Sequence, residues 1–216
     1  MDVDQEKRLA AEAAAEIVEN GMTVGLGTGS TVGYLLPALA RRGLSISCVA
    51  TSPRTMRAAS ELGLDVKPFD SIDHLDITID GADQIAPDGW LVKGGGGAHT
   101  REKIVAAAAS RFIVIGDSRK LVDVIRAPIP LELLEFGLPA TLRRLEPVVV
   151  REGPKSPDGG ILADYHGDVE DPARLSQWLS ATPGVVGHGL FPPELVASVL
   201  IGRGDSVERR TVRERR

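Results

Sequence analysis

The sequence predicts an α/β fold: a Rossmann-like, doubly wound and mostly parallel sheet with a smaller inserted α+β domain. Three observations predict this fold. Short apolar runs alternate with helix-like segments up to about Val124 of the 216 residues, which is typical of a parallel sheet covered on both faces. In this first half, the polar and glycine-rich segments directly follow the apolar runs, where α/β sheets bind their ligands. After Pro128, strand-like runs follow one another around a turn, which indicates an α+β unit.

Helices and strands alternate from the beginning of the chain. Leu9, Ala13 and Ile17 recur every four residues, as on the buried face of a helix, and Asn20-Gly21 is a suitable helix end. Pro37 lies inside the second expected helix and should kink it or delay its start. The first expected elements are a helix at 4–20, a strand at 23–26, a helix at 32–42 and a strand at 46–50.

Caps and periodicity indicate the next elements. Ser52-Pro53 is an N-cap followed by a proline at the first helical position, and Gly63 ends that helix. Residues 75–79 alternate between apolar and polar, as in a half-buried strand. The residues from Ala98 onward are strong helix formers. We therefore expect a helix at 53–62, strands at 64–66, 75–79 and 90–92, a helix from 98, and a strand at 111–117.

The pattern changes after Pro128-Ile129-Pro130. The turn residues at 156–160 separate two strand-like runs, and Asp171 caps a further helix. The expected elements are a helix at 131–145, strands at 148–150 and 161–165, a helix after 171, and strands at 184–190 and 196–201. We expect two domains: a catalytic α/β domain at 1–127 plus 197–216, and an inserted α+β domain at 128–196.

Composition and charge exclude several functional classes. Apolar residues make up 43% of the chain, yet no apolar run approaches the ~18 residues of a membrane span, so no membrane partner is expected. The net charge of −5 argues against nucleic acid as a partner. The acidic N-terminus is unlike a signal peptide, and lone Cys48 is expected in a buried strand, so we expect a cytoplasmic protein. A solvated, partly disordered end is expected around Arg203, Arg209, Arg210, Arg213, Arg215 and Arg216.

The reactive centre is expected between residues 80 and 103. The strand at 75–79 brings Asp80 to the carboxyl end of the sheet, and Asp83 follows on the next loop. Lys93 ends a short apolar run before four glycines and is well placed to face an oxyanion. Glu102 lies in the first turn of a helix, where a carboxylate should remain ionised at neutral pH and act as a general base.

The segment Gly27-Thr28-Gly29-Ser30-Thr31 predicts a phosphate site, since it offers three hydroxyls and free N–H groups at a helix start. It is not a Walker A loop, because no lysine has the required spacing, and Ser30 replaces the third glycine of a dinucleotide fingerprint. Alternatives remain open for these motifs. The loop at 27–31 could be a simple capped turn, and the four glycines could be a flexible linker. The two aspartates could be solvated turn residues or Mg²⁺ ligands, although no third carboxylate has suitable spacing for a metal site.

Five segments occur in an order that resembles ribose-5-phosphate isomerases of the type A family. They are GLGTGST at 25–31, TIDGADQI at 78–85, KGGGGAHTREKI at 93–104, IGDSRK at 115–120 and PGVVGHGLF at 183–191. The sequence departs from the family pattern at Gln84, where the family usually has Glu, and at His99, where it usually has Leu. Neither position is assigned direct chemistry.

The resemblance implies an aldose–ketose isomerase that interconverts D-ribose 5-phosphate and D-ribulose 5-phosphate through an enediolate, in the non-oxidative pentose phosphate pathway. It implies a homodimer and no metal or organic cofactor. Glu102 would carry a proton between C2 and C1, Lys93 would stabilise the oxyanion, and Asp80 and Asp83 would orient hydroxyls and assist ring opening. The implied substrate-binding residues are Thr28, Gly29, Ser30, Thr31, Gly81, Ala82, Gly94, Gly95, Gly96 and Lys120.

Two other functions remain as alternatives. A sugar-phosphate sensor of the same fold would bind without turnover, and the intact Lys93–Glu102 pair speaks against it. An acyl-CoA transferase-like enzyme would need a glutamate nucleophile on a loop at a strand end. A ketose assay and a test for a covalent acyl adduct distinguish these alternatives from an isomerase.

Overall fold

The main element of the structure, a computed structural model that describes residues 2–212, is a seven-stranded sheet. Its strand order is β14-β13-β7-β4-β1-β2-β3. Neighbouring strands in this range run parallel, except that β14 is antiparallel to β13. The strands are β1 (Thr23–Leu26), β2 (Ser47–Ala50), β3 (Asp65–Val66), β4 (Ile77–Gly81), β7 (Phe112–Asp117), β13 (Val196–Arg203) and β14 (Ser206–Thr211). The predicted α/β fold with a mostly parallel sheet is confirmed.

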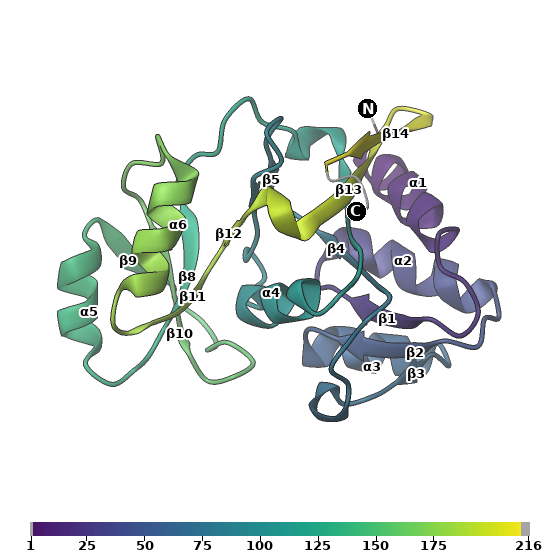
Figure 1. Ribbon diagram of the computed structural model, residues 1–216, viewed down its shortest axis with the longest axis horizontal. Helices are drawn as coiled ribbons and strands as arrows, with labels where there is room; N and C mark the ends of the chain where they lie inside the picture. The colour runs from purple at the N-terminus through teal and green to yellow at the C-terminus, as the bar shows by residue number, and fades with distance from the viewer. Residues whose placement is uncertain (1, 213–216) are drawn as a thin grey trace.

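Helices cover both faces of this sheet because its side chains alternate between the faces. In β7, Ile113 and Ile115 belong to the core that includes α1 and α2, whereas Phe112 and Val114 pack in the core that includes α4. Figure 1 shows α1, α2 and α3 at the right, with α4 nearer the centre. The helices are α1 (Val3–Ala15), α2 (Ser30–Arg41), α3 (Pro53–Glu61) and α4 (His99–Ala107).

Several helix ends differ from the predicted ones. The helix α1 ends at Ala15, because Ile17 and Val18 then bond three residues back in a tighter turn. The helix α2 starts at Ser30 and continues through Pro37. Ser52 caps α3 as predicted, and its side chain accepts a hydrogen bond from the backbone N–H of Thr55.

A second, antiparallel sheet lies at the left of Figure 1, with α5 and α6 beside it. Its strand order is β11-β8-β10-β9. The elements are β8 (Ile129–Leu133), α5 (Leu138–Leu145), β9 (Val148–Val150), β10 (Ile161–Tyr165), α6 (Pro172–Ala181) and β11 (Val185–His188). All of them lie within the range 128–196 that we propose as the inserted domain.

The helix predicted at 131–145 is wrong for its first part. Leu131 to Leu133 belong to β8, and α5 begins at Leu138. The strand β8 is paired on both sides, by β10 and β11, and all five of its residues are buried. A strand that is buried on both faces has no polar alternation, so periodicity alone does not separate it from a buried helix.

Two-residue strands connect the two large sheets. They are β5 (Gln84–Ile85), β6 (Leu91–Val92) and β12 (Leu190–Phe191), in the order β12-β6-β5. Short 3-10 helices are η1 (Phe69–Ser71), η2 (Ser118–Lys120) and η3 (Pro193–Leu195). The antiparallel pairing of β12 with β6 brings Phe191 opposite Leu91, two residues before Lys93.

Part of the arginine-rich end lies in two paired strands. Arg203 ends β13, and Arg209 and Arg210 lie in β14, opposite Leu200 and Val199. Arg213, Arg215 and Arg216 lie outside the described residues. Cys48 is buried in β2, as predicted. Among the described helices, none is long and apolar enough to cross a membrane.

Candidate active site

Asp80 lies at the carboxyl end of β4 and connects two parts of the site. Its Oδ1 accepts hydrogen bonds from the backbone N–H groups of Thr28 (3.0 Å) and Gly81 (2.7 Å). Its Oδ2 lies 2.8 Å from Nζ of Lys93. Asp80 is buried, with only 1% of its surface exposed. Because it contacts both Lys93 and the backbone of Thr28, it holds Lys93 in place relative to the loop after β1.

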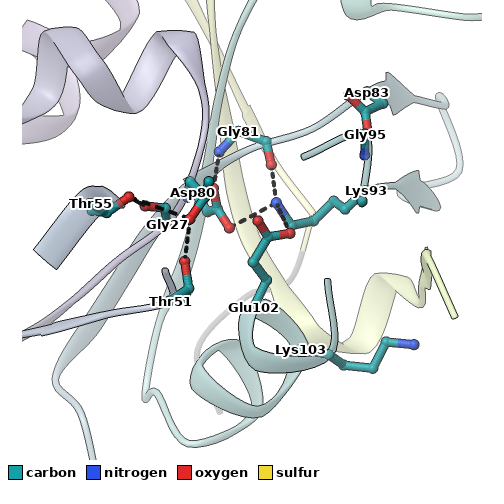
Figure 2. Close-up of polar contacts among 12 residues, drawn as sticks. Gly27, Thr51, Thr55, Asp80, Gly81, Asp83, Lys93, Gly95, Glu102 and Lys103 are labelled. Atoms are coloured by element: carbon teal, nitrogen blue, oxygen red, sulfur yellow. Dashed lines mark hydrogen bonds and ion pairs between the residues drawn. The ribbon is translucent and has the colours of Figure 1, made fainter. Parts of the chain in front are cut away.

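Lys93 follows β6 and points into the same cluster. Its Nζ contacts Oδ2 of Asp80 at 2.8 Å and Oε2 of Glu102 at 3.2 Å, and it also donates to the carbonyl oxygen of Gly81. Figure 2 shows these three contacts converging on the ammonium, whereas Lys103 points away from it. One hydrogen bond and two ion-pair contacts therefore compensate the buried ammonium for its loss of hydration.

The charges of Asp80, Lys93 and Glu102 determine each other's protonation. Burial opposes the ammonium of Lys93, but Asp80 and Glu102 together raise the pKa of Lys93 above its ordinary value. Burial raises the pKa of Asp80, and Lys93 opposes that rise. Two carboxyl groups thus share one permanent positive charge. One negative charge balances it, so the second carboxyl group takes up a proton readily.

The position of Glu102 in the first turn of α4 suggested a carboxylate that is ionised at neutral pH. The structure instead indicates a carboxyl group that is not fully ionised there. Burial, followed by the charge of Asp80, raises the pKa of Glu102 to about 8, although Lys93 opposes this shift. The side chain is 4% exposed. The loss of hydration therefore outweighs the favourable helix dipole, and this prediction is wrong for the free protein.

Asp83 and the glycine loop form the upper rim. Asp83 is exposed, and its Oδ2 accepts a hydrogen bond of 2.8 Å from the N–H of Gly95. Gly94 has φ +114°, and a Cβ there would lie 2.6 Å from Nδ1 of His99, so this position requires glycine. Arg151 donates to the carbonyl oxygen of Gly94 at 2.8 Å. Sequence reasoning missed Arg151 because no motif surrounds it.

The opposite end of the site is the start of α2. Gly29, with φ +142°, precedes the helix, and no described side chain caps its N–H groups. Free N–H groups at a helix start and the helix dipole together favour an anion. The hydroxyl of Thr28 pairs instead with the hydroxyls of Thr51 (2.8 Å) and Thr55 (3.4 Å). Thr51 was not predicted, although its place after β2 and beside β1 was a usable signal.

A single cavity brings the predicted residues together. Asp80 lies beneath it, and the other predicted site residues line it: Thr28, Gly29, Ser30, Thr31, Gly81, Ala82, Asp83, Lys93, Gly94, Gly95, Gly96, Glu102 and Lys120. The Lys93–Glu102 pair and the uncapped start of α2 thus line the same cavity. Within residues 2–212, no group of three or more His, Cys, Asp or Glu side chains is arranged to hold a metal ion.

Replacing Gly27 with Ala should damage both stability and activity. A Cβ at Gly27 would collide with the carboxylate of Asp80, which holds Lys93. Overpacking of this kind costs about 1–3 kcal/mol, and thermal denaturation measures it. Gly33→Ala is the matched control, because no described atom lies within 4 Å of a Cβ there. A Gly27→Ala variant with the melting temperature and activity of the control would contradict the close contact.

Comparisons with known proteins agree with one another. Residues 47–206 match the family described as ribose 5-phosphate isomerase A (phosphoriboisomerase A). The chain is 44% identical over 226 residues to the ribose-5-phosphate isomerase A of Bradyrhizobium diazoefficiens, covering 94% of each chain. A crystal structure of ribose 5-phosphate isomerase A from Neisseria gonorrhoeae matches with a TM-score of 0.93 and 30% identity, over 98% of each chain. A D-ribose-5-phosphate isomerase in complex with phospho-erythronic acid matches with a TM-score of 0.92 and 32% identity, over 98% of this chain and 100% of that one.

Proposed function

Because the chain belongs to the ribose 5-phosphate isomerase A family, it interconverts D-ribose 5-phosphate and D-ribulose 5-phosphate, and we propose that Glu102 and Lys93 carry out this reaction. The sensor and the acyl-CoA transferase-like enzyme are not retained. One observation supports the proposal most strongly: Oε2 of Glu102 lies 3.2 Å from Nζ of Lys93 at the wall of the cavity. A base and a cation that meet there suit proton abstraction next to a carbonyl group.

The phosphate of the substrate is proposed to bind at the start of α2. Ser30 and Thr31 begin that helix at the edge of the cavity, and Lys120 lines the same cavity. A phosphate dianion there meets backbone N–H groups, the positive end of the helix dipole and one ammonium group. The relative solved with phospho-erythronic acid supports a sugar-phosphate ligand of this kind. Anchoring the phosphate places the far end of the open chain near Glu102.

The proton transfer is proposed to use one carboxylate. Ionised Glu102 removes the proton from C2, and the electrons of that C–H bond form the C1=C2 bond of an enediolate. The former carbonyl oxygen gains negative charge, which the ammonium of Lys93 stabilises. The proton of the C2 hydroxyl passes to the oxygen at C1, Glu102 returns its own proton to C1, and the oxygen that remains on C2 becomes the ketone carbonyl. The pKa of Glu102, raised to about 8, favours this exchange, because a pKa close to the working pH lets the same carboxyl group both accept and return the proton.

Asp80 and Asp83 are proposed to have different roles in the site. Asp83 is exposed at the rim of the cavity, which suits the predicted orientation of substrate hydroxyls and assistance to ring opening. Asp80 is buried, and both of its oxygens have partners. We therefore propose that Asp80 acts through Lys93 and Thr28, by keeping the cation beside the reacting oxygen. This differs from the hydroxyl-orienting role that the resemblance implied.

The pH dependence of kcat/KM should report the ionisation of Glu102. A general base must be deprotonated, and the pKa of Glu102 is raised to about 8 in the free protein. Below that pH, kcat/KM should fall about tenfold per pH unit, and above it kcat/KM should level off. The measurement is kcat/KM for ribose 5-phosphate between about pH 5.5 and 9.5. A kcat/KM that stays level down to pH 5.5, as expected for a glutamate with the ordinary pKa of about 4.3, would contradict a buried base.

A ketose assay tests the proposed function. Purified protein is incubated with ribose 5-phosphate, with and without EDTA, and the ribulose 5-phosphate formed is measured colorimetrically. We expect turnover that EDTA does not change, because the proposed steps use side chains of this chain alone. Absence of turnover would contradict the isomerase, and loss of turnover with EDTA would contradict the metal-independent mechanism.

A homodimer in the cytoplasm is proposed as the working state. Large apolar side chains are exposed near the second sheet, among them Phe136 (94% exposed), Val149 and Val186, and burial against a second copy would remove them from water. Sedimentation tests the proposed homodimer, and cell fractionation tests the proposed cytoplasmic location.

A further inference from the structure

We propose that Glu6, on α1, is a positioning residue for Lys120 at the phosphate end of the active site. The inference rests on the proposed phosphate-binding role of Lys120. Glu6 lies in the N-terminal helix, far along the chain from the cavity-lining segments, and no motif marks it. Its carboxylate nevertheless bonds the turn that carries Lys120.

Glu6 joins two segments that are distant from it in sequence. Its Oε2 accepts hydrogen bonds from the backbone N–H of Ser118 (2.9 Å) and from the hydroxyl of Ser118 (2.7 Å). Its Oε1 accepts a hydrogen bond of 2.9 Å from the N–H of Gly204, in the turn between β13 and β14. Both oxygens of the carboxylate are therefore used, and Glu6 is 0% exposed.

The chemistry of this contact requires a carboxylate. All three donors point at oxygens, and the N–H of Gly204 with the groups of Ser118 holds the pKa of Glu6 below its ordinary value. Glu6 is thus ionised throughout the working pH range. Its backbone is also fixed, because a Cβ on Gly202 of β13 would collide with the carbonyl oxygen of Glu6. The helix therefore presents the carboxylate from a rigid position.

The contact reaches the cavity through η2. Ser118 is the first residue of this single turn and Lys120 the last, directly after β7. Lys120 is half-buried and lines the same cavity as the start of α2. A shift of Ser118 would move Lys120 with it, whereas Glu102 and Lys93 are attached to other elements. Loss of the Glu6 contact should therefore weaken phosphate binding without slowing the chemical step.

Replacing Glu6 with Gln tests this inference. The amide keeps one acceptor oxygen, but its NH₂ group replaces the other oxygen and faces N–H donors. The hydrogen bonds to either Ser118 or Gly204 are therefore lost. We expect KM for ribose 5-phosphate to rise by about three- to tenfold, the effect of one or two weakened hydrogen bonds, with kcat changed less than about twofold. Inhibition by inorganic phosphate should weaken by a similar factor. Glu12→Gln, on the same helix but in an exposed pair with Arg41, is the matched control and should leave KM unchanged.

A double variant separates positioning from general destabilisation. Lys120→Met alone should raise KM, and adding Glu6→Gln to it should have no further effect on KM if Glu6 acts through Lys120. An equal further rise in the double variant would overturn the inference and leave the proposed function intact. If Lys120→Met itself left KM unchanged, the phosphate role of Lys120 would be wrong as well.

Ser118→Ala provides a second test should Glu6→Gln not fold. It removes the hydroxyl contact and retains Glu6 and the backbone contact. A rise in KM of about twofold, absent in the Lys120→Met background, would support the inference. An unchanged KM would overturn it.

Discussion

Replacing Glu102 with Gln should lower kcat by about 10²–10⁴-fold, the contribution expected of a general base, while KM stays within a few-fold of its original value. The amide has the shape of the protonated acid and still offers an oxygen to Lys93, but it does not accept the proton from C2. The fold should be preserved, because Glu102 with its pKa of about 8 is already largely protonated at pH 7. Steady-state kinetics and circular dichroism measure the two effects.

Glu61→Gln is the control for this substitution. Glu61 is an exposed residue at the end of α3, so the same chemical change there should leave kcat unaffected. Near-normal turnover by Glu102→Gln would show that another group removes the proton. A large rise in KM with unchanged kcat would assign Glu102 to binding instead.

Replacing Lys93 with Ala should lower kcat by about 10²–10³-fold, more than it raises KM, because the oxygen facing Lys93 gains its charge in the transition state. Stability should fall as well. Removal of one partner from a buried ion pair costs about 3–5 kcal/mol, and Asp80 and Glu102 would share the cluster without a cation. The measurements are kcat, KM and the free energy of unfolding.

Lys67→Ala separates these effects from the loss of any lysine. Lys67 forms an exposed ion pair with Asp65, and exposed pairs contribute about 0–1 kcal/mol, so activity and stability should stay close to the original. If Lys93→Ala changed KM alone, Lys93 would bind the ground state and not the developing oxyanion.

The sequence predicted the parallel sheet because its strands and connecting helices have strong local signals. The runs at 23–26 and 111–117 are apolar and bounded by turns, and Ser52-Pro53 is a cap that functions locally. Residues 131–133 were wrongly predicted as helix, because β8 is buried on both faces and its residues do not alternate between apolar and polar. The strand β14 was not predicted, because its pairing with β13 is a contact that the local sequence pattern did not indicate.

The site was predictable to the extent that sheet topology determines it. The chain order suggested that Asp80, Lys93 and Glu102 come together, and they do. The expectation that the strand before Lys93 belongs to the parallel sheet is wrong, because β6 pairs with β5 and β12 in an antiparallel sheet. The protonation of Glu102 was not predictable, because burial depends on every element packed around it. Arg151 and Glu6 were missed for a related reason: each reaches the site through a backbone contact with a distant segment.

The fate of the hydrogen at C2 tests the central claim, that one carboxylate beside one ammonium carries the proton. Ribose 5-phosphate with deuterium at C2 is incubated in ordinary water, and mass spectrometry and NMR follow the label. We predict that the protein moves part of the label to C1 of ribulose 5-phosphate and loses the rest to solvent, and that Glu102→Gln leaves the label at C2. Loss of the C2 label at an unchanged rate in Glu102→Gln would contradict the claim.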